Sequence, residues 1–342
     1  MRRRRHDAEV VIRVHVHHGV VTSIRSRRLW AALAALVALA AAWAAVSARP
    51  AALPSGNVVL ATGGTQGVYF PYGTTLAEQL RARAPGVRTS VLETKGSVDN
   101  LEMVADGRAT FGLTAGDAAA EAFAGGEQFP SRVPLRAVAR VYDDYLHLVV
   151  LAGSPVRSVG DLAGLRVSVG SPRSGTALIA DRVLEVARIP AAEVRTVELG
   201  INESVAAMQA GEVDAFFWSG GLPTKGVAEL AAAVPIRLVP LGDLADGMRS
   251  RFGPSYRSAT VPPGMYGASE PVATIAVPNL LVCREDADPV LVERLASTLF
   301  GAREALGRTV PQADALDERT AIATFPVPLH PGAERYFRSV KL

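Results

Sequence analysis

Short apolar segments of strand length alternate with helical segments between residues 57 and 307, and this alternation constrains the fold more than any other feature. Val58–Ala61 is typical of a buried strand, whereas Pro71–Ala84 repeats Leu76 and Leu80 at helical spacing. Strands that alternate with helices along a chain form largely parallel sheets, and the helices cover both faces. We therefore predict an α/β fold.

The alternation restarts after residue 134, which divides the body into two similar α/β units. A chain of 342 residues is long enough for two such lobes. Apolar strands are predicted at Leu135–Val141, Tyr145–Leu151 and Thr274–Cys283. We predict a first lobe from residues 57–143 and 273–342 and a second lobe from residues 144–272, joined by two strands that cross near residues 143–148 and 273–281.

Two further segments of the body carry local signals. Gly242–Ser269 holds three prolines and several glycines, which predict a long loop. Pro289–Gly307 is amphipathic, with Asp288 as N-cap and Pro289 as first residue, which predicts one long helix.

An uninterrupted apolar segment, Leu29–Val46, precedes the body. Its 18 residues make about 27 Å of helix, close to the roughly 30 Å hydrocarbon core of a bilayer and longer than the usual apolar region of a signal peptide. Arg25, Arg27 and Arg28 precede it, a charge asymmetry that predicts export of the body. Residues 1–28 are then a basic cytoplasmic tail, residues 29–47 a transmembrane anchor or a signal helix cleaved near Ala48, and residues 48–56 a linker.

Charge and reactive side chains narrow the function of the body. Lys and Arg total 36 against 33 Asp and Glu, but residues 1–28 hold eight of the arginines. The remainder is slightly acidic, which argues against nucleic acid as a partner. The body has two histidines, His147 and His330, and its one cysteine, Cys283, lies in a strand-like apolar run. We expect these three residues to be structural, and we expect no enzyme, no metal site and no cofactor, because neither a catalytic triad nor a ligand cluster is present in the sequence.

Turns rich in glycine and hydroxyl groups follow successive predicted strands. The two longest, Gly63–Pro71 and Gly170–Thr176, each join a strand to a helix, one in each lobe. Ligands bind beyond the carboxyl ends of strands in open parallel sheets, and backbone amides at helix starts suit a carboxylate or phosphate. Neither a Walker loop nor a Gly-x-Gly-x-x-Gly spacing is present in Gly63–Pro71. A tight connection or an ordinary helix cap explains each turn equally well when it is taken alone.

Three smaller clusters occupy comparable strand ends, namely Lys95–Ser97, Gly116–Asp117 and Trp218–Gly221. Asp117 is either an N-cap or an acceptor for a ligand ammonium, and Trp218 is a candidate pocket wall. Arg173 either pairs with a ligand carboxylate or is solvated. The placement of all five turns at strand ends predicts one crevice between the lobes.

Several of these segments match a known family in order. A Thr-Gly-Gly-x-x-Gly-Val-Tyr-x-Pro turn runs from Thr62 to Pro71, and Gly-Ser-Val-x-Asn-Leu runs from Gly96 to Leu101. The matching segments that follow are Gly107–Asp117, Gly170–Thr176, Trp218–Pro223 and Val277–Val282. Over residues 57–306 the chain resembles the TAXI family, the solute receptors of TRAP-type transporters.

The resemblance implies a type II periplasmic-binding-protein-like fold of two α/β lobes joined by a two-strand hinge. It implies capture of a small acidic solute, a glutamate-like amino acid or a dicarboxylate, by lobe closure and delivery to a TRAP-type permease. Its ligand-binding candidates are Thr65, Gly67, Val68, Tyr69, Ser97, Asp117, Ser174, Gly175, Thr176 and Trp218. The basic tail and the apolar segment depart from a free receptor and leave a second function open, a membrane-tethered ligand-sensing module.

Overall fold

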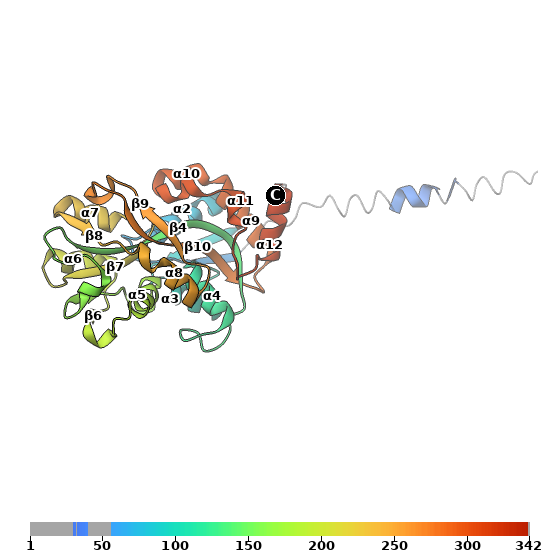
Figure 1. Cartoon of the computed structure of the whole chain (residues 1–342). Coiled ribbons are helices and arrows are strands. Elements are labelled where there is room, and N and C mark those ends of the chain that lie inside the picture. Colours follow the sequence, from blue (N-terminus) through green and yellow to red (C-terminus); the bar gives the residue numbers. More distant parts are fainter. Residues whose placement is uncertain (1–29, 32, 40–55, 341–342) are drawn as a thin grey trace, which may run out of the picture. The chain divides into compact units, whose positions relative to one another are not determined.

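The computed structural model describes residues 30–31, 33–39 and 56–340. Residues 30–31 and 33–39 are helical; the rest of the predicted tail, export segment and linker, up to residue 55, lies outside the described residues. Across the described ranges, no helix is both long and apolar enough to cross a membrane. Residues 56–340 form an α/β body (Figure 1).

The body is organised around one mixed sheet in the order β2-β1-β3-β10-β4-β7-β5-β6, with β8 added to β4 and β9 to β10. Its strands are β1 (Gly56–Ala61), β2 (Val87–Leu92), β3 (Phe111–Ala115), β4 (Leu135–Leu151), β5 (Arg166–Ser168), β6 (Arg195–Val197), β7 (Ala215–Gly220), β8 (Ile236–Leu238), β9 (Arg257–Val261) and β10 (Val272–Arg284). The pairs β1–β2, β1–β3, β5–β6 and β5–β7 are parallel, whereas β4 and β10 pair antiparallel between them. Two parallel α/β units therefore share a central pair of strands, and the predicted fold of two lobes joined by two strands is confirmed.

Helices cover both faces of the sheet in each lobe. The helices of the first lobe are α2 (Tyr69–Arg83), α3 (Ser97–Ala105), α4 (Gly116–Ala124), α9 (Pro289–Gly301), α10 (Arg303–Thr309), α11 (Glu318–Ala321) and α12 (Pro331–Ser339), with the short 3-10 helix η5 (Pro311–Ala315). Those of the second lobe are α5 (Gly175–Val186), α6 (Ile201–Gln209), α7 (Lys225–Ala233) and α8 (Ala245–Phe252), with the 3-10 helices η1 (Val159–Leu162), η2 (Ala191–Glu193), η3 (Gly242–Leu244) and η4 (Met265–Gly267). Each lobe therefore has one buried apolar cluster on either side of its strands.

The strands β4 and β10 change partners along their length. Residues 272–276 of β10 pair with β9, and residues 279–282 pair with β3. The second half of β4, residues 145–150, pairs with β7. These changes fall within the predicted crossings, so the chain passes between lobes through two continuous strands; the lobe boundaries at 143/144 and 272/273 stay a prediction.

Three local predictions were wrong. β4 is one strand of 17 residues rather than two, because Asp143 lies within it and accepts hydrogen bonds from Arg140 and Arg257 at 2.6 Å each instead of forming a turn. The predicted loop 242–269 contains α8 and β9. Their few buried side chains, such as Met248, are separated by polar residues in the sequence, so neither element has a clear apolar pattern. The predicted long helix ends at Gly301 and restarts at Arg303, although Asp288 is its N-cap as expected.

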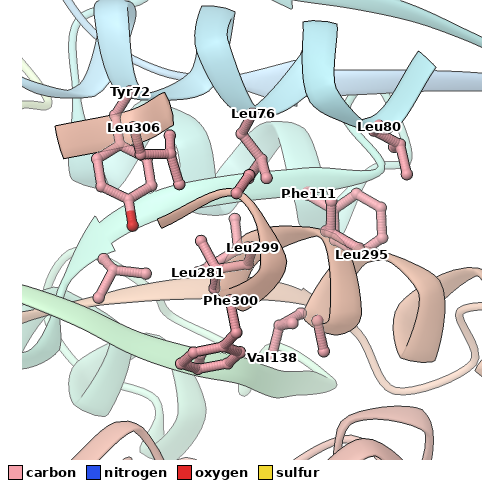
Figure 2. Close-up of a cluster of buried hydrophobic side chains, with 14 of the residues drawn as sticks. Tyr72, Leu76, Leu80, Phe111, Val138, Leu281, Leu295, Leu299, Phe300 and Leu306 are labelled. Atoms are coloured by element: carbon pink, nitrogen blue, oxygen red, sulfur yellow. The ribbon is translucent and has the colours of Figure 1, made fainter. Parts of the chain in front are cut away.

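The core of the first lobe is built from both ends of the body. Leu76 and Leu80 of α2 pack with Leu295 and Leu299 of α9 above Leu281 of β10 (Figure 2). In Figure 1 the red carboxyl-terminal helices accordingly lie beside the pale blue α2. The carboxyl-terminal segment is thus required to complete the lobe in which the chain begins.

Leu281→Ala tests this packing. Leu281 is fully buried, so we expect the loss of its side chain to lower the free energy of unfolding by about 2–5 kcal/mol in urea titrations. The control is Leu151→Ala at the exposed end of β4, where the side chain is 39% exposed and the expected loss is below about 1 kcal/mol. Equal losses for the two variants would contradict the described core.

Candidate functional site

A cavity of about 410 Å³ lies where the strand-end turns of the two lobes meet. Its size falls in the range of roughly 300–1,000 Å³ that is usual for small-molecule sites. Eight of the ten predicted ligand residues line it, namely Gly67, Val68, Tyr69, Ser97, Ser174, Gly175, Thr176 and Trp218. The structure therefore brings together turns that are far apart in the sequence.

The first lobe contributes the starts of α2 and α3. Tyr69 is the first residue of α2, and its hydroxyl lies 3.4 Å from the Ser97 hydroxyl and donates a hydrogen bond to Asn279 of β10. Ser97 opens α3 and accepts a hydrogen bond from the Ala115 amide at 3.0 Å. Gly96 precedes it with φ of 118°, a conformation that favours glycine. Hydroxyl groups at this wall are thus fixed by bonds to neighbouring strands.

The second lobe contributes the start of α5 and the end of β7. Ser174 is the N-cap of α5 and accepts a hydrogen bond from the Ala177 amide at 3.0 Å. Thr176 accepts one from the Ser219 amide at 3.2 Å, which ties the helix start to β7. The Trp218 indole donates to the Thr224 hydroxyl at 3.0 Å, which holds the ring against the cavity. Trp218 therefore lines the cavity, and its contact with a ligand stays a prediction.

The two walls approach closely. A β-carbon added at Gly175 would lie 2.6 Å from the Ser97 hydroxyl, and one added at Gly67 would lie 3.3 Å from the Trp218 ring. The Ser171 hydroxyl donates to the Lys95 carbonyl at 3.1 Å, and the Asp99 amide donates to the Arg173 carbonyl at 3.1 Å. Gly67 is needed for this approach and not for a positive φ. The two lobes are therefore closed against each other at the cavity.

Two predicted ligand residues do not reach the cavity. Thr65 is exposed at the tip of its turn. Asp117 is engaged by the other lobe: its carboxylate accepts hydrogen bonds from the Tyr256 hydroxyl at 2.6 Å and from Arg182 at 3.3 Å. Arg173 does not line the cavity either, because its guanidinium pairs with Glu102 of α3. Asp117 and Arg173, which the sequence suggests as ligand contacts, thus form polar contacts between the two lobes instead.

Arg182→Leu tests the largest of these junctions. Arg182 also pairs with Glu121, so its loss leaves two carboxylates without a cation, one fully buried and one nearly so. We expect the free energy of unfolding to fall by about 3–5 kcal/mol. The control is Arg166→Leu, whose pair with Asp214 is partly exposed, so its loss should lower the free energy of unfolding far less. A loss no larger than the control's would contradict a structural role for Arg182.

Sequence reasoning missed the most deeply buried acid at the cavity. Asp144 of β4 lines it and is 4% exposed, and burial raises the pKa of its carboxyl group to about 7. The nearby Asn279 amide donor and the hydrogen bond from Ser219 oppose this rise, whereas the charges of nearby Asp143 and Asp117 add to it. Tyr142, two residues earlier, also lines the cavity, and burial followed by the Asp144 charge raises the pKa of its phenol. The adjacent acids Asp143 and Asp144 are the sequence feature that could indicate this site, but they fall between the two predicted strands Leu135–Val141 and Tyr145–Leu151.

Asp144→Asn has an expected pH signature in the ligand-free protein. A carboxyl group with a raised pKa keeps its proton in the folded state from about pH 4 to about pH 7, so its contribution to stability is present at low pH and lost as the pH rises through 7. The variant cannot ionise, so its melting temperature relative to wild type should be higher at pH 8 than at pH 5, by an amount on the order of 3 kcal/mol in unfolding free energy. A difference independent of pH would contradict the raised pKa.

The charged side chains around the cavity are mainly acidic. Glu93, Glu198 and Glu203 join Asp144 among the lining residues, and Lys95 is the one basic side chain in that set. The three glutamates and Lys95 are exposed, so Asp144 is the one charge-bearing group deep in the cavity. Polar backbone at the helix starts and one buried acid therefore dominate its chemistry.

A family model described as the NMT1-like family matches residues 60–340, most of the body. The chain belongs to the NMT1-like family. A solved protein from Bordetella bronchiseptica RB50 is 18% identical over 83% of this NMT1-like chain and 89% of its own, with a TM-score of 0.50. The predicted type II periplasmic-binding-protein-like fold is thus the fold of this family member.

Two further solved structures have lower TM-scores against this NMT1-like protein. The alkanesulfonate-binding protein SsuA from Xanthomonas axonopodis pv. citri, bound to MOPS, is 19% identical over 85% of this chain and 92% of its own, with a TM-score of 0.47. The GluR0 ligand-binding core from Nostoc punctiforme, in complex with L-glutamate, is 14% identical over 74% of this chain and 98% of its own, with a TM-score of 0.46.

Proposed function

We propose that this protein is a receptor that captures a small carboxylate-bearing solute between its lobes outside the cytoplasm. The observation that carries the proposal is the cavity itself, because helix starts from both lobes converge on it. Free backbone amides and the helix dipole at such starts favour an anionic group. The matching residues Gly67, Ser97 and Thr176 become ligand contacts in this proposal.

Capture proceeds by movement of the lobes about β4 and β10. The lobes are covalently continuous through these two strands, and their other contacts near the cavity include polar ones such as the Ser171–Lys95 hydrogen bond and the Arg173–Glu102 ion pair. A solute that contacts both walls stabilises the closed arrangement by its differential affinity for that state. The function is therefore binding and release, with no catalytic step.

We further propose that the captured solute passes to a TRAP-type permease, as the TAXI-like motifs imply. Residues 29–47 then keep the receptor at the outer surface of the membrane or are removed near Ala48. Cells that lack the protein should lose uptake of the captured solute, and the wild-type chain should restore it. Uptake that does not depend on the protein would refute the transport role while leaving capture intact.

A thermal-shift screen of small carboxylic and amino acids tests capture. A ligand that binds the folded state alone stabilises it, so one or more compounds should raise the melting temperature by about 5–10 °C at a hundredfold excess over Kd. In Gly175→Ala the new methyl group would press on Ser97, and we expect the shift to disappear because the walls cannot close.

The matched control is Gly153→Ala, since a β-carbon there meets no atom within 4 Å. This variant should keep the full ligand-induced shift. A screen in which no compound stabilises the wild type, or in which Gly175→Ala responds as strongly as the control, would refute capture at this cavity.

A further inference from the structure

Polar atoms without partners cluster at one end of the cavity. Among the described residues, no hydrogen-bond partner is present for Asp144 Oδ1, the Tyr142 hydroxyl or Asn279 Nδ2. Asp144 and Tyr142 are each 4% exposed and both line the cavity, and Asn279 lies beside them on β10. Tyr142 and Asn279 lie near enough to Asp144 to affect its carboxyl group, but none of the three atoms makes a well-formed hydrogen bond in the described ranges. Buried polar groups in native proteins are nearly always hydrogen-bonded, so this cluster can accept a ligand group.

Asp144 is the acceptor of this cluster and lacks a cationic donor among the residues that the structure describes, whereas Asn279 Nδ2 is itself a donor and needs an oxygen acceptor. The other carboxylate oxygen of Asp144 already accepts a hydrogen bond from the Ser219 hydroxyl at 3.3 Å, which is a neutral donor. Within the described part of the chain, Asp144 makes no ion pair with Arg, Lys or His, unlike its neighbour Asp143. An ammonium group supplies three donors and the compensating charge, and Tyr142 offers it an oxygen acceptor.

The other lining charges favour the same class of ligand. Lys95 is the one basic lining side chain, and three glutamates accompany Asp144 around the cavity. A second carboxylate on the ligand would therefore face an acidic surround, which is unfavourable by Coulomb's law. The starts of α5 and α3 also line the cavity, and their first amides are the candidates to hold a single ligand carboxylate.

We propose, building on solute capture at this cavity, that the solute is an amino acid with a neutral or basic side chain, its ammonium group bound by Asp144 and Tyr142 and its carboxylate by the starts of α5 and α3. Asp144 is then the residue that selects amino compounds over dicarboxylates. The preference runs against the acidic solute that the TAXI resemblance implies.

A different use of Asp144 has the opposite pH dependence. If the protonated carboxyl group donated to a ligand carboxylate, binding would tighten as the pH falls; if the ionised form binds ammonium, binding tightens as the pH rises. Burial places the pKa of Asp144 near 7, within reach of both. The titratable and charged groups around it are Tyr69 of α2, Asp117 of α4, Tyr142 and Asp143 of β4, and Glu93, Lys95, Glu198 and Glu203 around the cavity.

The experiment is calorimetric titration of the full-length protein with matched compounds. L-glutamine, L-lysine, L-leucine and L-glutamate are each compared with the analogue in which hydrogen or hydroxyl replaces the amino group. We expect the tightest binder to be glutamine, lysine or leucine, and its amine-free analogue to bind about 30-fold more weakly or worse. Its affinity should rise about tenfold or more from pH 5.5 to pH 8, as Asp144 ionises.

Two variants assign the effect to Asp144. Asp144→Asn should lower the affinity for the amino acid about 30-fold or more and remove the pH dependence, with little change for the amine-free analogue. Glu93→Gln, which removes an exposed lining charge, should change either affinity less than about threefold. Retained melting temperature at pH 8 verifies that both variants are folded.

The outcomes separate this proposal from solute capture. Amine-free acids or glutamate binding as tightly as the best neutral or basic amino acid, or affinity that rises toward low pH, overturns the amino-acid assignment and leaves capture standing. An Asp144→Asn variant that binds the amino acid as well as wild type also overturns the assignment. Absence of binding by every compound overturns both proposals.

Discussion

Two strands that belong to both lobes are the constraint on which the rest of the structure depends. β4 and β10 pair with each other from residue 135 to residue 145 and from 276 to 284. β10 also pairs with β3 of the first lobe and β9 of the second, and β4 also pairs with β7 and β8 of the second lobe. Because the parallel strands on either side of this pair end toward the same crevice, the turns after β1, β2, β3, β5 and β7 converge. The cavity is thus a consequence of sheet topology, and the individual turns decide only its chemistry.

The polar groups of the cavity are of two kinds: some are held in place by hydrogen bonds within the protein, and others lack a hydrogen-bond partner among the described residues. Ser97, Ser174 and Thr176 are held by hydrogen bonds within the protein, so their positions are set before any ligand arrives. Asp144 and Tyr142 are buried and each keep an atom that has no hydrogen-bond partner among the residues that the structure describes. The raised pKa of Asp144 has the same origin, since burial disfavours its charge until a cation compensates it. The same burial that disfavours the ionised form of Asp144 in the ligand-free protein therefore favours binding of a cationic ligand group there.

The sequence predicted the fold and most of the lining residues because both depend on local signals. Strand-helix alternation and glycine-containing turns are readable from neighbouring residues, and the parallel topology then brings turns such as Gly67–Tyr69 and Ser174–Thr176 together. The partners of Asp117 and Arg173 and the burial of Asp144 could not be predicted, because they depend on tertiary contacts. Arg182, which is distant in sequence, forms an ion pair with Asp117, and Glu102 forms one with Arg173. Asp144 is buried because β4 continues through Asp143 as one strand. Residues 1–29 and 40–55 are outside the described part, so the anchor or signal role of the apolar segment stays a prediction.

A crystal structure of the protein isolated with its natural solute is the most direct test of the central claim, that both lobes hold one small molecule at this cavity. We expect density in contact with the first residues of α5 of the second lobe and with Tyr69 and Ser97 of the first lobe, as well as with Asp144 and Tyr142. Density for the solute on one lobe alone, or outside the cavity, would contradict it.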